Sequence, residues 1–169
     1  GDRVYLFPND SNVAPAAAEV KKLSDKNVEV IPTRDMAGGI AGLFELRGRS
    51  EPPAPDDLGR ATARPKAGAV FFAGKDSSLG GVTVVRGKPA ATFGGKLLAA
   101  SSLTATARAL LDAMGAGAGG LITLYYGGTQ KERDAKRLAE DLQTTFPNVD
   151  VEYYFGGQKN EEYVVSFDD

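Results

Sequence analysis

The pattern of apolar and polar residues divides the chain into three stretches. Two short apolar runs, at residues 4–7 and 28–31, are each followed by a polar loop and then by apolar residues at helical spacing. This order predicts two parallel strands, each followed by a helix, over residues 1–46. Residues 47–66 are polar, rich in proline and without a period, so we expect a surface linker there.

The third stretch, residues 67–169, has mostly strand patterning. Gly94-Gly95 separates two short runs and predicts a hairpin within an antiparallel meander. Two amphipathic helices are expected, at about 102–114 and 129–145, with strands around them at 69–73, 82–85, 91–93, 96–99, 121–126, 149–155 and 163–167. The fold class is therefore α/β: an N-terminal parallel βαβα unit joined to a mixed, partly antiparallel sheet unit with two helices. We expect the two parts to form one compact domain.

Helix starts and helix faces follow from the same pattern. Ser11 or Asn12 is expected to cap the first helix, Asp35 the second, and Ser101 or Ser102 the third. Thr129 is expected to cap the last, where Glu132 completes a capping-box spacing. The first helix is predicted to turn an apolar stripe inward, made of Val13, Ala16, Ala17, Val20 and Leu23. In the second helix, Ile40, Leu43 and Phe44 lie on one face.

Aromatic residues occur next to one another in three of the predicted strands: Phe71, Phe72, Tyr125, Tyr126, Tyr153, Tyr154 and Phe155. Neighbouring residues of a strand point to opposite faces of the sheet. Some of these rings must therefore lie outside a single core. We favour a sheet covered on both faces, and the alternative is an exposed contact surface.

Composition excludes several kinds of chemistry. The chain has 169 residues, 42% of them hydrophobic and 25% charged, with a net charge of -2. This balance predicts neither nucleic-acid binding nor membrane insertion. Because the sequence has no Cys and no His, it cannot form disulfides, a Cys-His or Ser-His-Asp site, or a His-ligated zinc site. No signal peptide opens the chain, which favours a cytoplasmic location.

The candidate site lies in the two loops that follow the first two strands. In open α/β sheets, this carboxyl edge is where binding sites usually lie. The residues we single out for binding a partner or an anion are Asn9, Ser11, Asn12, Thr33, Arg34, Gly38 and Gly39. Asn, Ser and Gly also serve as ordinary capping and turn residues, and this alternative stays open.

The sequence contains no recognisable catalytic or cofactor-binding motif. Gly is abundant, but no dinucleotide-binding or Walker-A spacing follows a strand. Three pairs of adjacent acids, at 56–57, 161–162 and 168–169, are expected to be solvated. No nucleophile lies beside an activating base, and no set of oxygen ligands converges on a metal. We therefore expect no catalytic residue, metal site or cofactor in this chain.

Both ends of the sequence resemble one family. The matching segments are Val4-Tyr5-Leu6-Phe7-Pro8-Asn9, Val28-Glu29-Val30-Ile31-Pro32-Thr33-Arg34, Gly39-Ile40-Ala41, Phe146-Pro147-Asn148-Val149-Asp150-Val151-Glu152 and Gly156-Gly157-Gln158. They resemble the C-terminal region of the bacterial fatty-acid kinase A protein, a dihydroxyacetone-kinase-like family also labelled "DAK phosphatase". The layout is similar to the DegV fold.

The resemblance implies a role in lipid metabolism. In that family, an N-terminal kinase domain uses ATP and Mg²⁺, and the C-terminal part engages a fatty-acid-binding, DegV-type B subunit whose acyl group is phosphorylated. The kinase domain is expected outside this sequence, which begins abruptly at a strand. The leading hypothesis is a non-catalytic domain that docks the B subunit. The rival is a small α/β domain that binds phosphate or carboxylate, and a homodimer is compatible with either.

Overall fold

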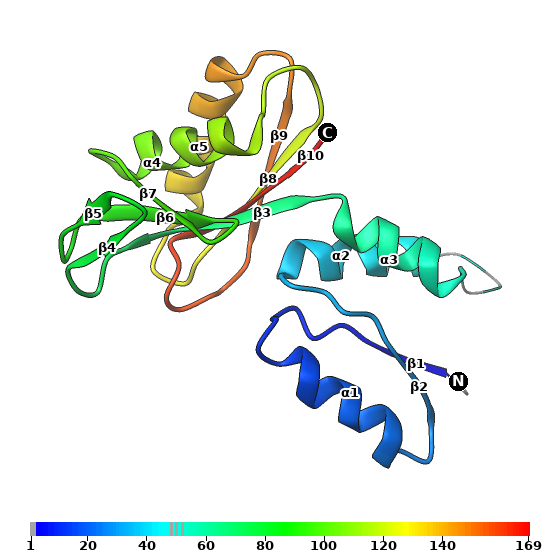
Figure 1. Cartoon of the computed structure of the whole chain (residues 1–169). Coiled ribbons are helices and arrows are strands. Elements are labelled where there is room, and N and C mark those ends of the chain that lie inside the picture. The colour runs from blue at the N-terminus through cyan, green and yellow to red at the C-terminus, as the bar shows by residue number, and fades with distance from the viewer. Residues whose placement is uncertain (1–2, 48, 50, 52) are drawn as a thin grey trace. The chain divides into compact units, whose positions relative to one another are not determined.

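The computed structural model describes residues 3–47, 49, 51 and 53–169 (Figure 1). It divides into two units, Gly1–Pro65 and Lys66–Asp169. The prediction that both units form one compact domain stays a prediction.

The first unit contains the expected parallel pair of strands. β1 (Arg3–Leu6) pairs with β2 (Asn27–Val30) in parallel, with Leu6 opposite Val30. α1 (Ala14–Leu23) connects the two strands, and α2 (Met36–Leu46) follows β2. The βαβα prediction is confirmed, and both loops leave the same edge of the pair.

The predicted inward stripe of α1 is wrong in part. Ala17 is buried, whereas Val13 is 47%, Val20 44% and Leu23 84% exposed. A two-stranded sheet offers a narrow surface, so it covers only the small residue at the centre of the stripe.

The linker prediction for residues 47–66 is also wrong in part, because residues 55–63 form the helix α3 (Pro55–Ala63). Pro55 suits the first helical turn. The carboxylates of Asp56 and Asp57 in the same turn interact favourably with the positive end of the helix dipole. Leu58 is fully buried and fixes the helix in the unit.

Glycine residues of α2 form its close contacts with α3 and with Phe7. A Cβ on Gly38 would lie 2.6 Å from the carbonyl oxygen of Thr62 in α3, and one on Gly42 would overlap the ring of Phe7. Glycine therefore lets the backbone of α2 approach both elements closely.

The second unit is built on a six-stranded mixed sheet in the order β7-β6-β3-β10-β8-β9. β8 and β9 are parallel and the other neighbours are antiparallel. A small β4–β5 hairpin forms where the sequence pattern predicts a loop before a single strand. The elements are β3 (Lys66–Phe72), β4 (Ser77–Leu79), β5 (Val82–Val84), β6 (Pro89–Phe93), β7 (Lys96–Ala99), α4 (Leu103–Met114), β8 (Leu121–Tyr126), α5 (Glu132–Thr145), β9 (Asp150–Phe155) and β10 (Tyr163–Asp168).

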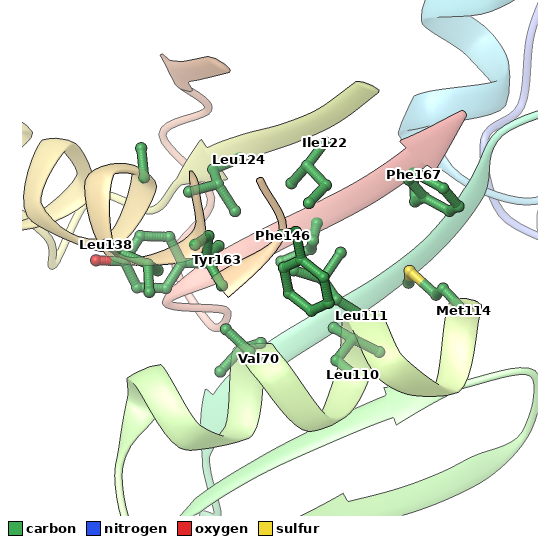
Figure 2. Packing of buried hydrophobic residues seen from close by; sticks show 14 of the residues in the cluster. Val70, Leu110, Leu111, Met114, Ile122, Leu124, Leu138, Phe146, Tyr163 and Phe167 are labelled. Carbon is green, nitrogen blue, oxygen red and sulfur yellow. The ribbon is translucent and has the colours of Figure 1, made fainter. Parts of the chain in front are cut away.

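α4 and α5 supply the main core of this unit. Figure 2 shows Leu110, Leu111 and Met114 of α4 packed with Val70 and Phe167 of the sheet. Each fully buried Leu contributes about 1.5–3 kcal/mol through removal of its side chain from water. A smaller cluster of Ala73, Val84, Ala90 and Leu97 joins the hairpin to the sheet. The predicted α/β class, with a mixed sheet and two helices, is confirmed.

Helix capping agrees with the sequence at two of the four predicted positions. At the start of α4, Ser102 Oγ accepts the N–H of Ala105 at 3.1 Å, as predicted. The Asp35 carboxylate accepts the N–H of Gly38 at 2.9 Å, as predicted. α1 has no side-chain cap, and the N–H of Asn12 instead donates to Asp10 Oδ1 at 2.7 Å. The capping box at Thr129 is wrong, because α5 begins after Lys131 and the Thr129 hydroxyl binds Glu162 instead.

The close packing of α2 predicts the effect of adding a methyl group. Gly38→Ala should lower the free energy of unfolding by about 1–3 kcal/mol, because its Cβ meets backbone that cannot turn away. Gly59→Ala in α3 is the matched control. Its Cβ has no neighbour within 4 Å, so higher helix propensity should leave stability unchanged or raise it by up to about 1 kcal/mol. Urea denaturation measures both, and equal effects of the two substitutions would contradict this packing.

Candidate functional site

A pair of hydrogen bonds joins the two loops that follow β1 and β2. The Asn9 N–H donates to Thr33 Oγ1 at 3.0 Å, and the Thr33 hydroxyl donates to Asn9 Oδ1 at 2.8 Å. Thr33 is 2% exposed, so these bonds satisfy a hydroxyl that is nearly out of contact with water. The structure thus brings together Asn9 and Thr33, two of the residues singled out in the sequence.

The backbone of Asn9 is adapted to this contact. Its φ is 57°, in the left-handed region that Asn tolerates better than most residues. Gly39 lies directly against the Asn9 amide, and any Cβ there would overlap it. Gly39 is therefore part of the packing around the loop junction.

The other candidates divide between internal and exposed positions. The Gly38 N–H is occupied by the Asp35 cap, and the Gly39 N–H donates to the Asp35 carbonyl at 3.2 Å. Ser11, Asn12 and Arg34 are exposed, and Arg34 forms no ion pair among the described residues. The N–H groups of Gly38 and Gly39 thus already have acceptors in Asp35.

The outer surface of α2 is apolar. Leu43 is 58% and Phe44 65% exposed, whereas Ala37, Gly38, Gly39 and Gly42 are buried. Large apolar residues usually fill cores, so the exposure of these two is unusual. Here the close approach of neighbouring backbone leaves room only for glycine and alanine on the inner face.

A second polar cluster, which the sequence analysis missed, lies beyond the carboxyl end of β8. Glu162 is 9% exposed, and its carboxylate accepts hydrogen bonds from Thr129 Oγ1 at 2.7 Å and from Gln130 Nε2. The Tyr163 hydroxyl donates to Gln130 Oε1 at 3.3 Å. The expectation that both acids at 161–162 are solvated is wrong for Glu162. Thr129 and Gln130 are distant from it in sequence, and no local pattern indicated the pairing.

Burial raises the pKa of Tyr163 to about 12, and the negative charges of Asp134 and Glu162 act in the same direction. The ring borders an open hollow of about 490 Å³ between α4 and α5. Most of its lining is polar: Leu103, Thr104, Gln130, Asp134, Arg137, Leu138, Glu140, Asp141, Thr144 and Tyr163. An acyl chain placed here would desolvate several charged groups, so the hollow is unsuited to a long apolar ligand.

The described part of the chain holds no cluster of three or more acidic residues, His or Cys arranged to bind a metal. Within the same residues, no helix is long and apolar enough to cross a membrane.

Comparison with solved structures identifies the fold class. The fatty acid binding protein DegV from Bacillus subtilis superimposes with a TM-score of 0.59 at 13% identity, over 99% of this chain and 71% of that one. A DegV family protein from Eubacterium eligens loaded with heptadecanoic acid gives 0.60 at 16% identity, over 99% and 73%. The Streptococcus pneumoniae fatty acid kinase B3 protein loaded with linoleic acid gives 0.57 at 14%, over 99% and 72%. The chain thus has the DegV fold.

The chain belongs to the family of C-terminal domains of fatty acid kinase A-like proteins, whose model matches residues 1–168. Protein YloV of Bacillus subtilis is 26% identical over 167 residues, and an uncharacterized protein of Staphylococcus haemolyticus is 26% identical over 166. These matches cover 98% and 97% of this chain, but only 30% of each relative. The predicted resemblance is confirmed.

The loop junction predicts different effects for two substitutions of Thr33. Thr33→Val keeps the shape but leaves the Asn9 N–H and Oδ1 without their partner, at a cost of about 1–3 kcal/mol in unfolding free energy. Thr33→Ser keeps the hydroxyl, so its unfolding free energy should fall by less. Chemical denaturation distinguishes them, and a valine variant at least as stable as the serine variant would contradict the assigned bonds.

Tyr163 predicts a loss of stability at high pH. The hydroxyl keeps its proton to about pH 12 in the folded chain but loses it near its ordinary pKa of about 10 when unfolded. Stability is therefore full below about pH 10 and falls as the pH rises toward about 12. In urea titrations, the free energy of unfolding of Tyr163→Phe should decline less steeply over this pH range than that of the parent chain. Because Tyr125 and Tyr154 are retained in both proteins, the difference isolates Tyr163, and parallel curves would contradict the assignment.

Proposed function

We propose that this chain is a non-catalytic docking domain, which holds a fatty-acid-binding, DegV-type subunit for phosphorylation by a kinase domain elsewhere in the full-length protein. ATP and Mg²⁺ would then bind that kinase domain. Family membership supports the association with fatty acid kinase. The docking role rests on the surface chemistry of the first unit.

The exposed apolar surface of α2 is the observation that carries this proposal. Leu43 and Phe44 project from a helix whose opposite side is fixed by glycine packing, so they cannot turn inward without losing that packing. Large exposed aromatic and aliphatic side chains on a rigid helix are typical anchors of protein interfaces. We call Leu43 and Phe44 together the α2 anchor.

The polar loops that follow β1 and β2 support recognition better than catalysis. Asn9 and Thr33 satisfy each other, and Asp35 satisfies the start of α2. These bonds hold the two loops in place, and three polar residues of the loops, Ser11, Asn12 and Arg34, are exposed. Exposed polar residues of this kind can contribute hydrogen bonds to an interface.

The rival proposal, an anion site at the same loops, has less support. Arg34 is exposed and could pair with a carboxylate or phosphate. However, Gly38 and Gly39 already donate their N–H groups to Asp35, whose carboxylate would repel an anion. Thermal-shift measurements with inorganic phosphate and with a fatty acid test this alternative, since a ligand of the folded state raises the melting temperature.

The α2 anchor predicts the effect of placing charges in it. Leu43→Asp/Phe44→Asp should raise the Kd for a DegV-type fatty-acid-binding subunit by at least about tenfold, because two carboxylates would lose water on docking. Calorimetric titration with the lipid-loaded subunit measures this. Both replaced side chains are exposed, so the melting temperature should change little.

The matched control is Leu79→Asp/Val85→Asp, which places two charges at similarly exposed apolar positions of the second unit. Its Kd should equal that of the parent chain. Loss of binding in both double variants would show only general sensitivity to charge. Undiminished binding by the anchor variant would refute the anchor, and no binding by the parent chain would refute docking itself.

A further inference from the structure

β9 lies at one edge of the six-stranded sheet, beside β8 (Figure 1). The N–H groups of Asp150 and Gly156 donate to β8 and its flanking residue, at 3.0 Å to Gly120 and 3.0 Å to Tyr126. Backbone groups alternate in direction along a strand, so those of Val151, Tyr153 and Phe155 point away from β8. Among the described residues, no strand pairs with that side.

The two edges of the sheet differ in how they resist further pairing. β7, at the other edge, has four residues and begins with Lys96. Short strands and Lys are common protections of an edge. β9 has six residues, DVEYYF, with neither Lys nor Pro. It is therefore the edge that remains competent to add a strand.

Aromatic side chains are exposed on both faces at the end of β9. Tyr154 is 52% and Phe155 67% exposed. Each ring packs on a ring of β8 and is thereby held in place, with centroids 6.3 Å apart for Tyr125–Tyr154 and 5.4 Å for Tyr126–Phe155. The sequence-based preference for a fully covered sheet is therefore wrong at this edge.

We propose that β9 pairs with β9 of a second copy of this chain, in antiparallel register centred on Tyr153. A two-fold axis at this point makes the interface self-complementary. Tyr153 then faces Tyr153 of the second copy, and Val151 faces Phe155. All of these residues have outward backbone groups, so each facing pair can exchange two hydrogen bonds.

The acidic residues of β9 select this register. Centred on Tyr153, the register places Glu152 opposite Tyr154 of the second copy. In the single chain, the Tyr154 hydroxyl already donates to Glu152 Oε2 at 3.0 Å, so the same pair of groups can bond between copies. A register centred on Val151 would instead place Asp150 opposite Glu152, and like charges directly opposite each other are unfavourable. One centred on Phe155 would extend beyond the end of the strand.

Sedimentation equilibrium of the 169-residue chain tests the pairing. Between about 1 µM and 1 mM, the parent chain should pass from monomer toward dimer. Phe155→Lys should raise the dimer Kd by at least about tenfold, because it places an ammonium group at the paired edge. Phe72→Lys is the matched control: it replaces another exposed aromatic of the same sheet, 44% exposed and outside β9, and should leave the Kd unchanged.

Amide hydrogen exchange locates the interface without any substitution. Protection at Val151, Tyr153 and Phe155 should rise with protein concentration, whereas Glu152 and Tyr154, whose N–H groups face β8, should be protected throughout. A monomer over the whole concentration range would overturn the proposal. So would a dimer in which exchange at the three outward residues is independent of concentration, because a different surface would then be buried.

Discussion

The close approach of α2 to its neighbours is the constraint on which the first unit depends. Gly38 meets the Thr62 carbonyl, Gly39 the Asn9 amide and Gly42 the Phe7 ring, each at a distance that leaves no room for a Cβ. Because the inner face of the helix admits only Ala and Gly, Leu43 and Phe44 lie on the outer face. The same packing that stabilises the unit therefore leaves Leu43 and Phe44 exposed.

The polar groups of the loop junction and of the Glu162 cluster serve mainly to stabilise the structure. Asn9 bonds Thr33 across two loops, and Glu162 collects Thr129 and Gln130 around a buried carboxylate. Buried polar groups that satisfy one another rigidify the elements they join. Rigid loops and a rigid helix would present a docking surface at a low entropic cost, since little need be ordered on binding. This supports recognition over catalysis as the role of the chain.

Sequence patterning predicted much of the fold but little of the site. Periodicity identified the parallel βαβα unit and the mixed sheet, because their strands have clear polar boundaries. It failed at α3, where the three prolines at 52, 53 and 55 concealed a helix that one of them begins. It could not show that Leu43 and Phe44 are exposed, since exposure there depends on what α2 packs against. Glu162 could not be predicted as buried, because its partners lie more than thirty residues earlier in the chain.

Competition in trans tests the central claim most directly. A full-length fatty acid kinase A protein of this family would phosphorylate the acyl group of its lipid-loaded, DegV-type subunit while the isolated chain is added in excess over that subunit. The docking account predicts that the initial rate falls as the chain sequesters the subunit, and that more subunit restores it. A rate that stays constant with the chain in large excess would contradict the account.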